Sequence, residues 1–190
     1  MTEKLKIGWG VCGSFCTISQ FCDALEILAE KNTLVPIISD IVRTTDTRFG
    51  DAVGVVSRIE YISGRTAIKS VRDAEPLGPK EPLDLLVIAP CTGNTLAKIA
   101  NGITDTPVTM AAKAHLRQDR PLVIALCSND ALSQNLANIA KMLTRKSCYF
   151  VPMTEDDPEK KPYSLIADIP SLHASIESAL SGRQMMPLFV

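Results

Sequence analysis

The stretch LDLLVIAPCTGNTLAKIA, residues 83–100, decides the fold. Its first seven residues are apolar except for Asp84, and a continuous apolar run of this length is typical of a strand that is buried on both faces of a sheet. A loop of small and hydroxyl-bearing residues follows at once, PCTGNT (90–95). Apolar side chains then recur at helical spacing, at Leu96, Ile99, Ala100 and Ile103. A strand, a short polar loop and a helix form the repeating unit of a parallel α/β sheet.

The same unit recurs along the chain. Further strands are predicted at KLKIGWGV (4–11), LVPIIS (34–39), PLVIALC (121–127) and CYFVP (148–152). Helices are predicted over 18–28, 52–61, 132–143 and 172–180, and Thr17-Ile18-Ser19-Gln20 has the pattern of a capping box before the first of them. The alternation predicts one α/β domain over residues 1–190, with a doubly wound parallel sheet between helical layers, a three-layer Rossmann-like fold.

The composition narrows the class of protein. The 190 residues are 46% hydrophobic and carry a net charge of −1, so neither nucleic acid nor an anionic membrane is an expected partner. No apolar run is long enough to span a bilayer and no signal-peptide pattern follows Met1, so a cytoplasmic location is expected. The six cysteines form no C-x-x-C pair, which favours reduced, buried thiols and no metal site.

Gly8, Gly10 and Gly13 spell G-x-G-x-x-G, the pattern of a dinucleotide-binding turn. That interpretation requires the strand to stop before the first glycine and an acidic residue about 20 positions further on. The first available acid, Asp40, comes later than this, and Trp9 and Val11 continue the apolar run. We therefore expect the first two glycines inside the strand and the turn at Gly13-Ser14.

Four polar loops follow predicted strands, at 12–14, 39–49, 90–95 and 127–130. The carboxyl ends of parallel strands meet at one edge of the sheet, where such folds bind ligands. Free N–H groups at a helix N-terminus attract an anion, Gly93 would leave room for its approach, and Thr92, Asn94 and Thr95 would add hydrogen bonds. In any one loop these residues serve equally well as helix caps. Because four loops converge, we expect a ligand that carries a phosphate.

The segment VIAPCTGNTLAKIANGITDTPVTMAAKAHLRQDRPLVI, residues 87–124, resembles the FMN-binding flavoprotein family, which includes cysteine decarboxylases and flavin prenyltransferases. The resemblance implies FMN as cofactor and a homo-oligomer, a trimer or larger. It also implies that Met110 and Ala111 occupy a segment through which a neighbouring subunit contacts the pocket. By the same resemblance the remaining flavin contacts are Gly13, Ser14, Ser39, Arg48, Phe49, Pro90, Thr92, Gly93, Asn94 and Thr95.

One branch of this family is resembled over most of the chain. The segments that carry this likeness are TDTRFG (45–50), AEPLGPK (74–80), MAAKA (110–114), SNDAL (128–132) and DDPEKKP (156–162). The branch supplies the second component of a two-component synthase. The resemblance implies a dehydrogenase-like partner that carries NAD(P), and joint oxidation of a dihydropyridine dicarboxylate to an aromatic dicarboxylate during sporulation, in the cytoplasm of the mother cell.

Two departures from the better-known relatives bear on activity. The decarboxylases use a histidine in the second helical region, and residues 50–85 contain none. The prenyltransferases have an arginine after the fourth strand, where this chain has Ser128-Asn129-Asp130. These departures favour one component of an oxidoreductase. Two alternatives stay open: a non-catalytic partner with a vestigial pocket, and a stand-alone FMN-dependent decarboxylase.

A small dicarboxylate substrate requires cations, and Lys113, Arg117, Lys160 and Lys161 are the candidates. The last two stand equally well in a solvated loop, and 156–158 could form a rim over the pocket. Cys91 is either a nucleophile at a helix start or, as we prefer, a small filler of the loop. His115 is expected on a helix, at the surface or partly packed. No catalytic residue is assigned from the sequence.

Overall fold

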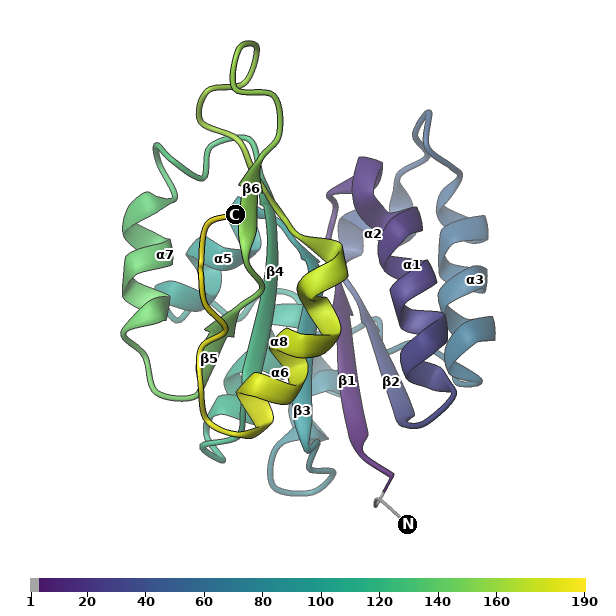
Figure 1. The fold of residues 1–190 in the computed structure, drawn as a ribbon. Helices are drawn as coiled ribbons and strands as arrows, with labels where there is room; N and C mark the ends of the chain where they lie inside the picture. The colour runs from purple at the N-terminus through teal and green to yellow at the C-terminus, as the bar shows by residue number, and fades with distance from the viewer. Residues whose placement is uncertain (1–3) are drawn as a thin grey trace.

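A computed structural model describes residues 4–190 and shows a seven-stranded sheet between two helical layers (Figure 1). Five of its strands run parallel in the order β2-β1-β3-β4-β5. Their bounds are β1 (Lys6–Val11), β2 (Thr33–Ile38), β3 (Leu85–Cys91), β4 (Leu122–Ser128) and β5 (Cys148–Phe150). Every residue of β3 and β4 is buried, because helices cover both faces of the sheet. The predicted doubly wound α/β fold and its five strands are confirmed.

Two short strands that the sequence did not predict extend the sheet. β6 (Met153–Glu155) and β7 (Leu165–Ala167) form a hairpin, and β7 pairs antiparallel with the last residues of β4, Cys127 and Ser128. The loop of this hairpin rises above the end of the sheet at which the parallel strands finish (Figure 1). Three-residue strands are too short to show a period of two, which is why the pattern did not predict them.

The helices divide into two layers with a core on each face of the sheet. One layer consists of α1 (Phe15–Ala29), α3 (Ala52–Ser63) and α8 (Leu172–Leu180). The other consists of α4 (Val71–Ala74), α5 (Gly93–Ala100), α6 (Pro107–Leu116) and α7 (Leu136–Leu143). Short helices at the connections are α2 (Asp40–Thr44), η1 (Glu75–Leu77) and η2 (Ile169–Ser171). In the described part of the chain no helix has both the length and the apolar character of a membrane span.

Three predicted helix boundaries were wrong. Thr17 does not cap α1: it lies within the helix, and its hydroxyl donates to the carbonyl oxygen of Ser14 over 2.9 Å. Leu132 lies in a turn before α7, since the carbonyl of Asp130 accepts hydrogen bonds from the backbone N–H groups of Ser133 and Asn135. Ile103 lies beyond the end of α5.

The first two glycines of the G-x-G-x-x-G pattern lie inside β1, as predicted. A Cβ atom on Gly10 would stand 3.1 Å from Cγ1 of Val108 in α6, and one on Gly8 would stand 2.8 Å from Cδ1 of Leu86 in β3. Glycine at these positions therefore lets α6 and the side chains of β3 pack closely on the sheet. The pattern is a packing feature, and the dinucleotide-turn interpretation does not apply.

Candidate cofactor site at the carboxyl edge of the sheet

The loops that follow β1, β2 and β3 are joined to one another. The backbone N–H of Cys12 donates to the carbonyl oxygen of Pro90 over 3.1 Å, and that of Ser39 donates to the carbonyl oxygen of Val11 over 3.1 Å. The thiol of Cys12 also forms a hydrogen bond with the side chain of Thr95. The carboxyl edge of the sheet is thus one continuous surface, as the topology required.

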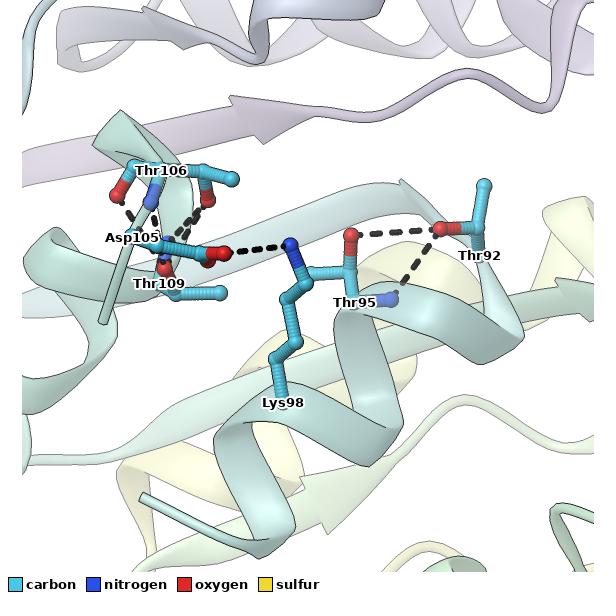
Figure 2. A network of polar contacts seen from close by, with 6 residues as sticks. All are labelled: Thr92, Thr95, Lys98, Asp105, Thr106 and Thr109. Atoms are coloured by element: carbon cyan, nitrogen blue, oxygen red, sulfur yellow. Dashed lines mark hydrogen bonds and ion pairs between the residues drawn. The ribbon is translucent and has the colours of Figure 1, made fainter. Parts of the chain in front are cut away.

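The first turn of α5 is capped by the chain's own hydroxyls (Figure 2). The Thr92 hydroxyl accepts a hydrogen bond from the Thr95 backbone N–H over 3.2 Å and donates to the Thr95 hydroxyl over 3.1 Å. Asn94, which stands between them, is exposed and forms no side-chain hydrogen bond among residues 4–190. In this turn Thr92 is the helix cap, whereas the amide of Asn94 is available to a ligand.

Gly93 has a different role from the predicted one. A Cβ atom there would collide with side-chain atoms of Ser128, Asp130 and Asn135, which crowd the first turn of α5. The Ser128 hydroxyl donates a short hydrogen bond to the Asp130 carboxylate within this cluster. Glycine is therefore needed for packing against the loop after β4, and the expectation that it leaves room for a ligand was wrong.

Ser39 supplies an unpaired polar group at the same edge. The residue is 6% exposed and its hydroxyl has no hydrogen-bond partner among the described residues. A buried polar atom without a partner is uncommon and calls for an explanation, such as a bound group. Gly13 and Ser14 lie in the adjacent loop, half-buried, and the Ser14 hydroxyl accepts from that of Thr17 over 3.2 Å. These residues present backbone and hydroxyl groups that fit a polar cofactor.

The loop after α2 leads to the larger of two pockets. The guanidinium of Arg48 lies 4.8 Å from the centre of the Phe49 ring, an arrangement that favours cation–π attraction. The pocket, of about 210 Å³, lies between this loop, α1 and α3, and Phe49 lines it with Phe15 and Arg58. Arg58 is held by Asp23 of α1 at 2.6 Å. The sequence analysis missed Phe15 and Arg58, since no local motif marks a contact between separate helices.

The α6 residues do not join this edge. Ala111 is fully buried in the core and Met110 is partly buried against it. Lys113 lines a separate pocket of about 100 Å³ together with Arg145, and Arg117 follows the end of α6, close in the chain to the start of β4. The expectation that Lys113 and Arg117 meet a substrate beside the cofactor loops is therefore contradicted, because α6 carries them toward the opposite edge of the sheet.

Lys160 and Lys161 lie in the β6–β7 hairpin loop. The Lys161 ammonium contacts the Asp156 carboxylate at 2.7 Å, and this hydrogen bond raises the pKa of Lys161. Lys160 is mostly exposed and lies 3.7 Å from Asp157. The Tyr163 carbonyl accepts from the Leu132 backbone N–H over 3.0 Å, which ties the hairpin to the loop after β4. The hairpin thus stands beside the edge, where a rim was predicted.

The thiols at the edge are packing groups. Burial raises the pKa of Cys12 and of Cys127 to about 11, and it raises the pKa of Cys91 well above its ordinary value. Thiols with such pKa values are protonated at neutral pH and are poor nucleophiles. This favours the interpretation of Cys91 as a filler of the loop. All six cysteines are free, and Cys16 alone among them is exposed.

His115 lies away from the edge and is fully buried, contrary to the expectation of a surface or partly packed position. Its Nε2 atom lies 2.8 Å from the carbonyl oxygen of Pro121, and its Nδ1 atom has no partner in the described chain. Burial lowers the pKa of His115. The ring is a neutral core group with a structural hydrogen bond.

The family follows from the whole sequence together with this edge. A model of the flavoprotein family matches residues 1–171. The chain belongs to the flavoprotein family. Its resemblance to that family, inferred above from residues 87–124, is confirmed over most of the chain.

Among members of the flavoprotein family, the B subunit of dipicolinate synthase from Bacillus subtilis (strain 168) is 44% identical over 186 residues, which cover 97% of this chain and 93% of that protein. The crystal structure of the dipicolinate synthase B subunit from Bacillus halodurans C superposes with a TM-score of 0.89 at 41% identity, covering 98% of this chain and 96% of that one. The branch with the two-component synthase is thus that of dipicolinate synthase.

The FMN-dependent cysteine decarboxylase SpaF shares the flavoprotein fold at 24% identity, with a TM-score of 0.70 over 93% of this chain and 95% of that one. The carboxyl edge of the present chain fits a flavin cofactor in two respects. The buried Ser39 hydroxyl lacks a partner among the described residues, and the exposed Asn94 amide stands at the N-terminus of α5, where anions are favoured.

Proposed function

We propose that this chain is the B subunit of a dipicolinate synthase and acts with a dehydrogenase-like A subunit. The two would together oxidise a dihydrodipicolinate-type precursor to dipicolinate during sporulation. The observation that carries the proposal is the 44% identity with the Bacillus subtilis B subunit across nearly the whole of both chains. Identity of this extent leaves few positions at which a different overall activity could have been built.

The cofactor of this chain is FMN in the proposal, held at the carboxyl edge by the loops of Gly13, Ser39 and Asn94. Membership of the flavoprotein family and the fit of the edge support this. When bound, a flavin accepts a hydride, which is the two-electron step that aromatisation of a dihydropyridine requires. NAD(P) belongs to the dehydrogenase-like partner in this scheme.

The protein's own contribution is to hold the reactants and to exclude water. The hairpin loop with Lys160 lies beside the edge, so its exposed ammonium is available to a carboxylate of the substrate. Lys161 is already engaged by Asp156 and would form the base of the loop. Homo-oligomerisation is part of the proposal, as are a cytoplasmic location and Phe49, half-exposed at the pocket mouth, as a flavin contact.

The test is reconstitution. This chain and the dehydrogenase-like partner, each purified and inactive or weakly active alone, should together form dipicolinate from the dihydrodipicolinate-type precursor, measured by the ultraviolet absorbance of the product. Asn94→Ala should lower the rate without preventing assembly, which gel filtration would record. An unchanged rate in the Asn94→Ala mixture, with assembly intact, would favour the alternative in which this chain is a non-catalytic partner.

A further inference from the structure

Oxidation of a dihydropyridine ring to a pyridine removes a hydride and a proton, and the proton needs a base. A general base must have a free acceptor atom near the reacting ring. The candidates at the carboxyl edge are carboxylates, because its buried thiols are protonated and His115 lies in the core away from it. The question is which carboxylate is free to accept a proton.

Most acidic side chains around the edge are already engaged. Asp46 and Asp51 accept hydrogen bonds from the backbone N–H groups of Ala52 and Gly54 at the start of α3. Three others are paired with cations, at distances of 2.6, 2.7 and 3.7 Å: Asp40 with Arg43, Asp156 with Lys161 and Asp157 with Lys160. Glu155 is exposed at the end of β6, separated from β4 by β7.

Asp130 differs from all of these. Among the described residues it has no cationic partner, and its only side-chain hydrogen bond is the one that its Oδ1 atom accepts from the Ser128 hydroxyl. Its Oδ2 atom has no partner in that part of the chain. Its backbone carbonyl accepts from the N–H groups of Ser133 and Asn135 at 3.2 and 3.1 Å, so the residue is held in place while one carboxylate oxygen stays free.

The position of Asp130 is also suitable. A Cβ atom on Gly93 would lie 2.7 Å from Asp130 Oδ1, so the carboxylate stands against the first turn of α5. Asn94, the proposed flavin contact, is the next residue of that turn. The hairpin with Lys160 is anchored to the same loop through Leu132. Carboxylate, cofactor turn and substrate loop therefore meet within a few residues of one another.

We propose that Asp130 is the catalytic base of this oxidation, an inference that rests on the proposed function. A ring C–H bond breaks and its proton passes to the Asp130 carboxylate, forming an O–H bond, while the electron pair stays in the ring. The hydride leaves a second ring carbon for a flavin or nicotinamide acceptor, which completes the aromatic ring. Asp130 then releases its proton to water. Ser128 is a positioning residue that holds the carboxylate.

The test uses the mixture of both proteins with Asp130→Asn, which preserves the shape and the acceptor for Ser128 but not the basicity. We expect kcat to fall by about 100-fold or more, the size typical of general-base catalysis, with KM and FMN affinity within about twofold of wild type. Asp119→Asn is the matched control: Asp119 has a φ of 55°, which asparagine adopts readily, and pairs with Lys146 far from the edge. It should leave kcat unchanged.

Three further readouts separate a base from a structural group. The acidic limb of the wild-type pH–rate profile should disappear in Asp130→Asn, Asp130→Glu should recover part of kcat, and Ser128→Ala should lower kcat several-fold. In D2O without an oxidant, the wild type should exchange a ring hydrogen of the substrate faster than Asp130→Asn does, as followed by proton NMR. This last readout is independent of turnover.

The outcomes distinguish the two proposals. A wild-type mixture that forms no dipicolinate overturns the proposed function and this inference with it. An active wild type whose Asp130→Asn variant keeps more than a third of kcat, or exchanges the ring hydrogen at the wild-type rate, overturns the inference alone. If Asp130→Asn does not fold, Asp130→Glu and Ser128→Ala decide: full activity in both contradicts a base at this position.

Discussion

Cys12 and Pro90 are joined by a backbone hydrogen bond of 3.1 Å between the loops that follow β1 and β3. A second such bond joins Ser39 to Val11, so the main chain alone holds three loops of the edge together. Side chains of that edge, such as Asn94, are therefore free to be changed without loss of its framework. Substitutions there should affect ligand binding, whereas substitutions beneath it should affect stability.

The glycines inside β1 provide the stability half of this contrast. Gly8→Ala and Gly10→Ala each place a Cβ atom against packed side chains, at 2.5 Å from Leu83 and 3.1 Å from Val108 respectively. Overpacking of this kind should lower the free energy of unfolding by about 1–3 kcal/mol. Urea unfolding followed by circular dichroism measures it, and two variants as stable as wild type would show that the space above β1 is not restricted.

Gly93→Ala should disturb both properties at once. The added methyl group would push the first turn of α5 away from Ser128 and Asn135, with a loss of about 1–3 kcal/mol in unfolding free energy. Because the same turn carries Asn94, FMN affinity should fall as well. Isothermal titration at a temperature where the variant is folded separates the two effects, and unchanged FMN affinity in Gly93→Ala would contradict a role for this turn.

His115 predicts a dependence of stability on pH. Its pKa is lowered in the folded protein, so the unfolded chain binds the proton more tightly. The free energy of unfolding should therefore fall as pH decreases below the unfolded value of about 6.5, until the folded pKa is passed. His115→Gln, which keeps a donor for the Pro121 carbonyl, should remove this part of the pH dependence. Equal slopes for wild type and variant would be inconsistent with a buried neutral ring.

The two interactions at the start of α6 should contribute unequally (Figure 2). Thr106 and Thr109 form a reciprocal capping box, and Thr106→Ala should cost about 1 kcal/mol. The adjacent ion pair between Lys98 and Asp105 spans 2.9 Å, but the Asp105 side chain is 55% exposed, so Asp105→Asn should cost less than about 1 kcal/mol. Thermal melts rank the pair, and a larger loss from Asp105→Asn would reverse the interpretation.

The sequence predicted the parallel core of the fold because the strands at 83–89 and 121–127 are long and almost wholly apolar. The β6–β7 hairpin escaped prediction, since two three-residue strands acquire their identity by pairing with Ser128 and its neighbours. The start of α1 was misplaced for a related reason. Ser14 precedes that helix without making a side-chain cap, so no local signal marks the boundary.

The candidate site was predictable to the extent that it depends on strand order. Residues that follow β1, β2 and β3 had to meet, and they do. Lys113 and Arg117 were misassigned because a sequence does not show which way α6 runs across the sheet. Asp130 and Arg58 were not assigned because their roles depend on groups brought close by the fold, Gly93 in one case and Asp23 in the other.

The central claim is a flavin site at the carboxyl edge, and an equilibrium titration with FMN tests it most directly, with NAD and NADP as parallel ligands. Flavin fluorescence should be quenched saturably by the wild type, and Asn94→Ala and Ser39→Ala should each weaken binding about tenfold or more while NAD and NADP do not bind. No saturable FMN binding, with or without the dehydrogenase-like partner, or equal affinity in both variants, would contradict the account.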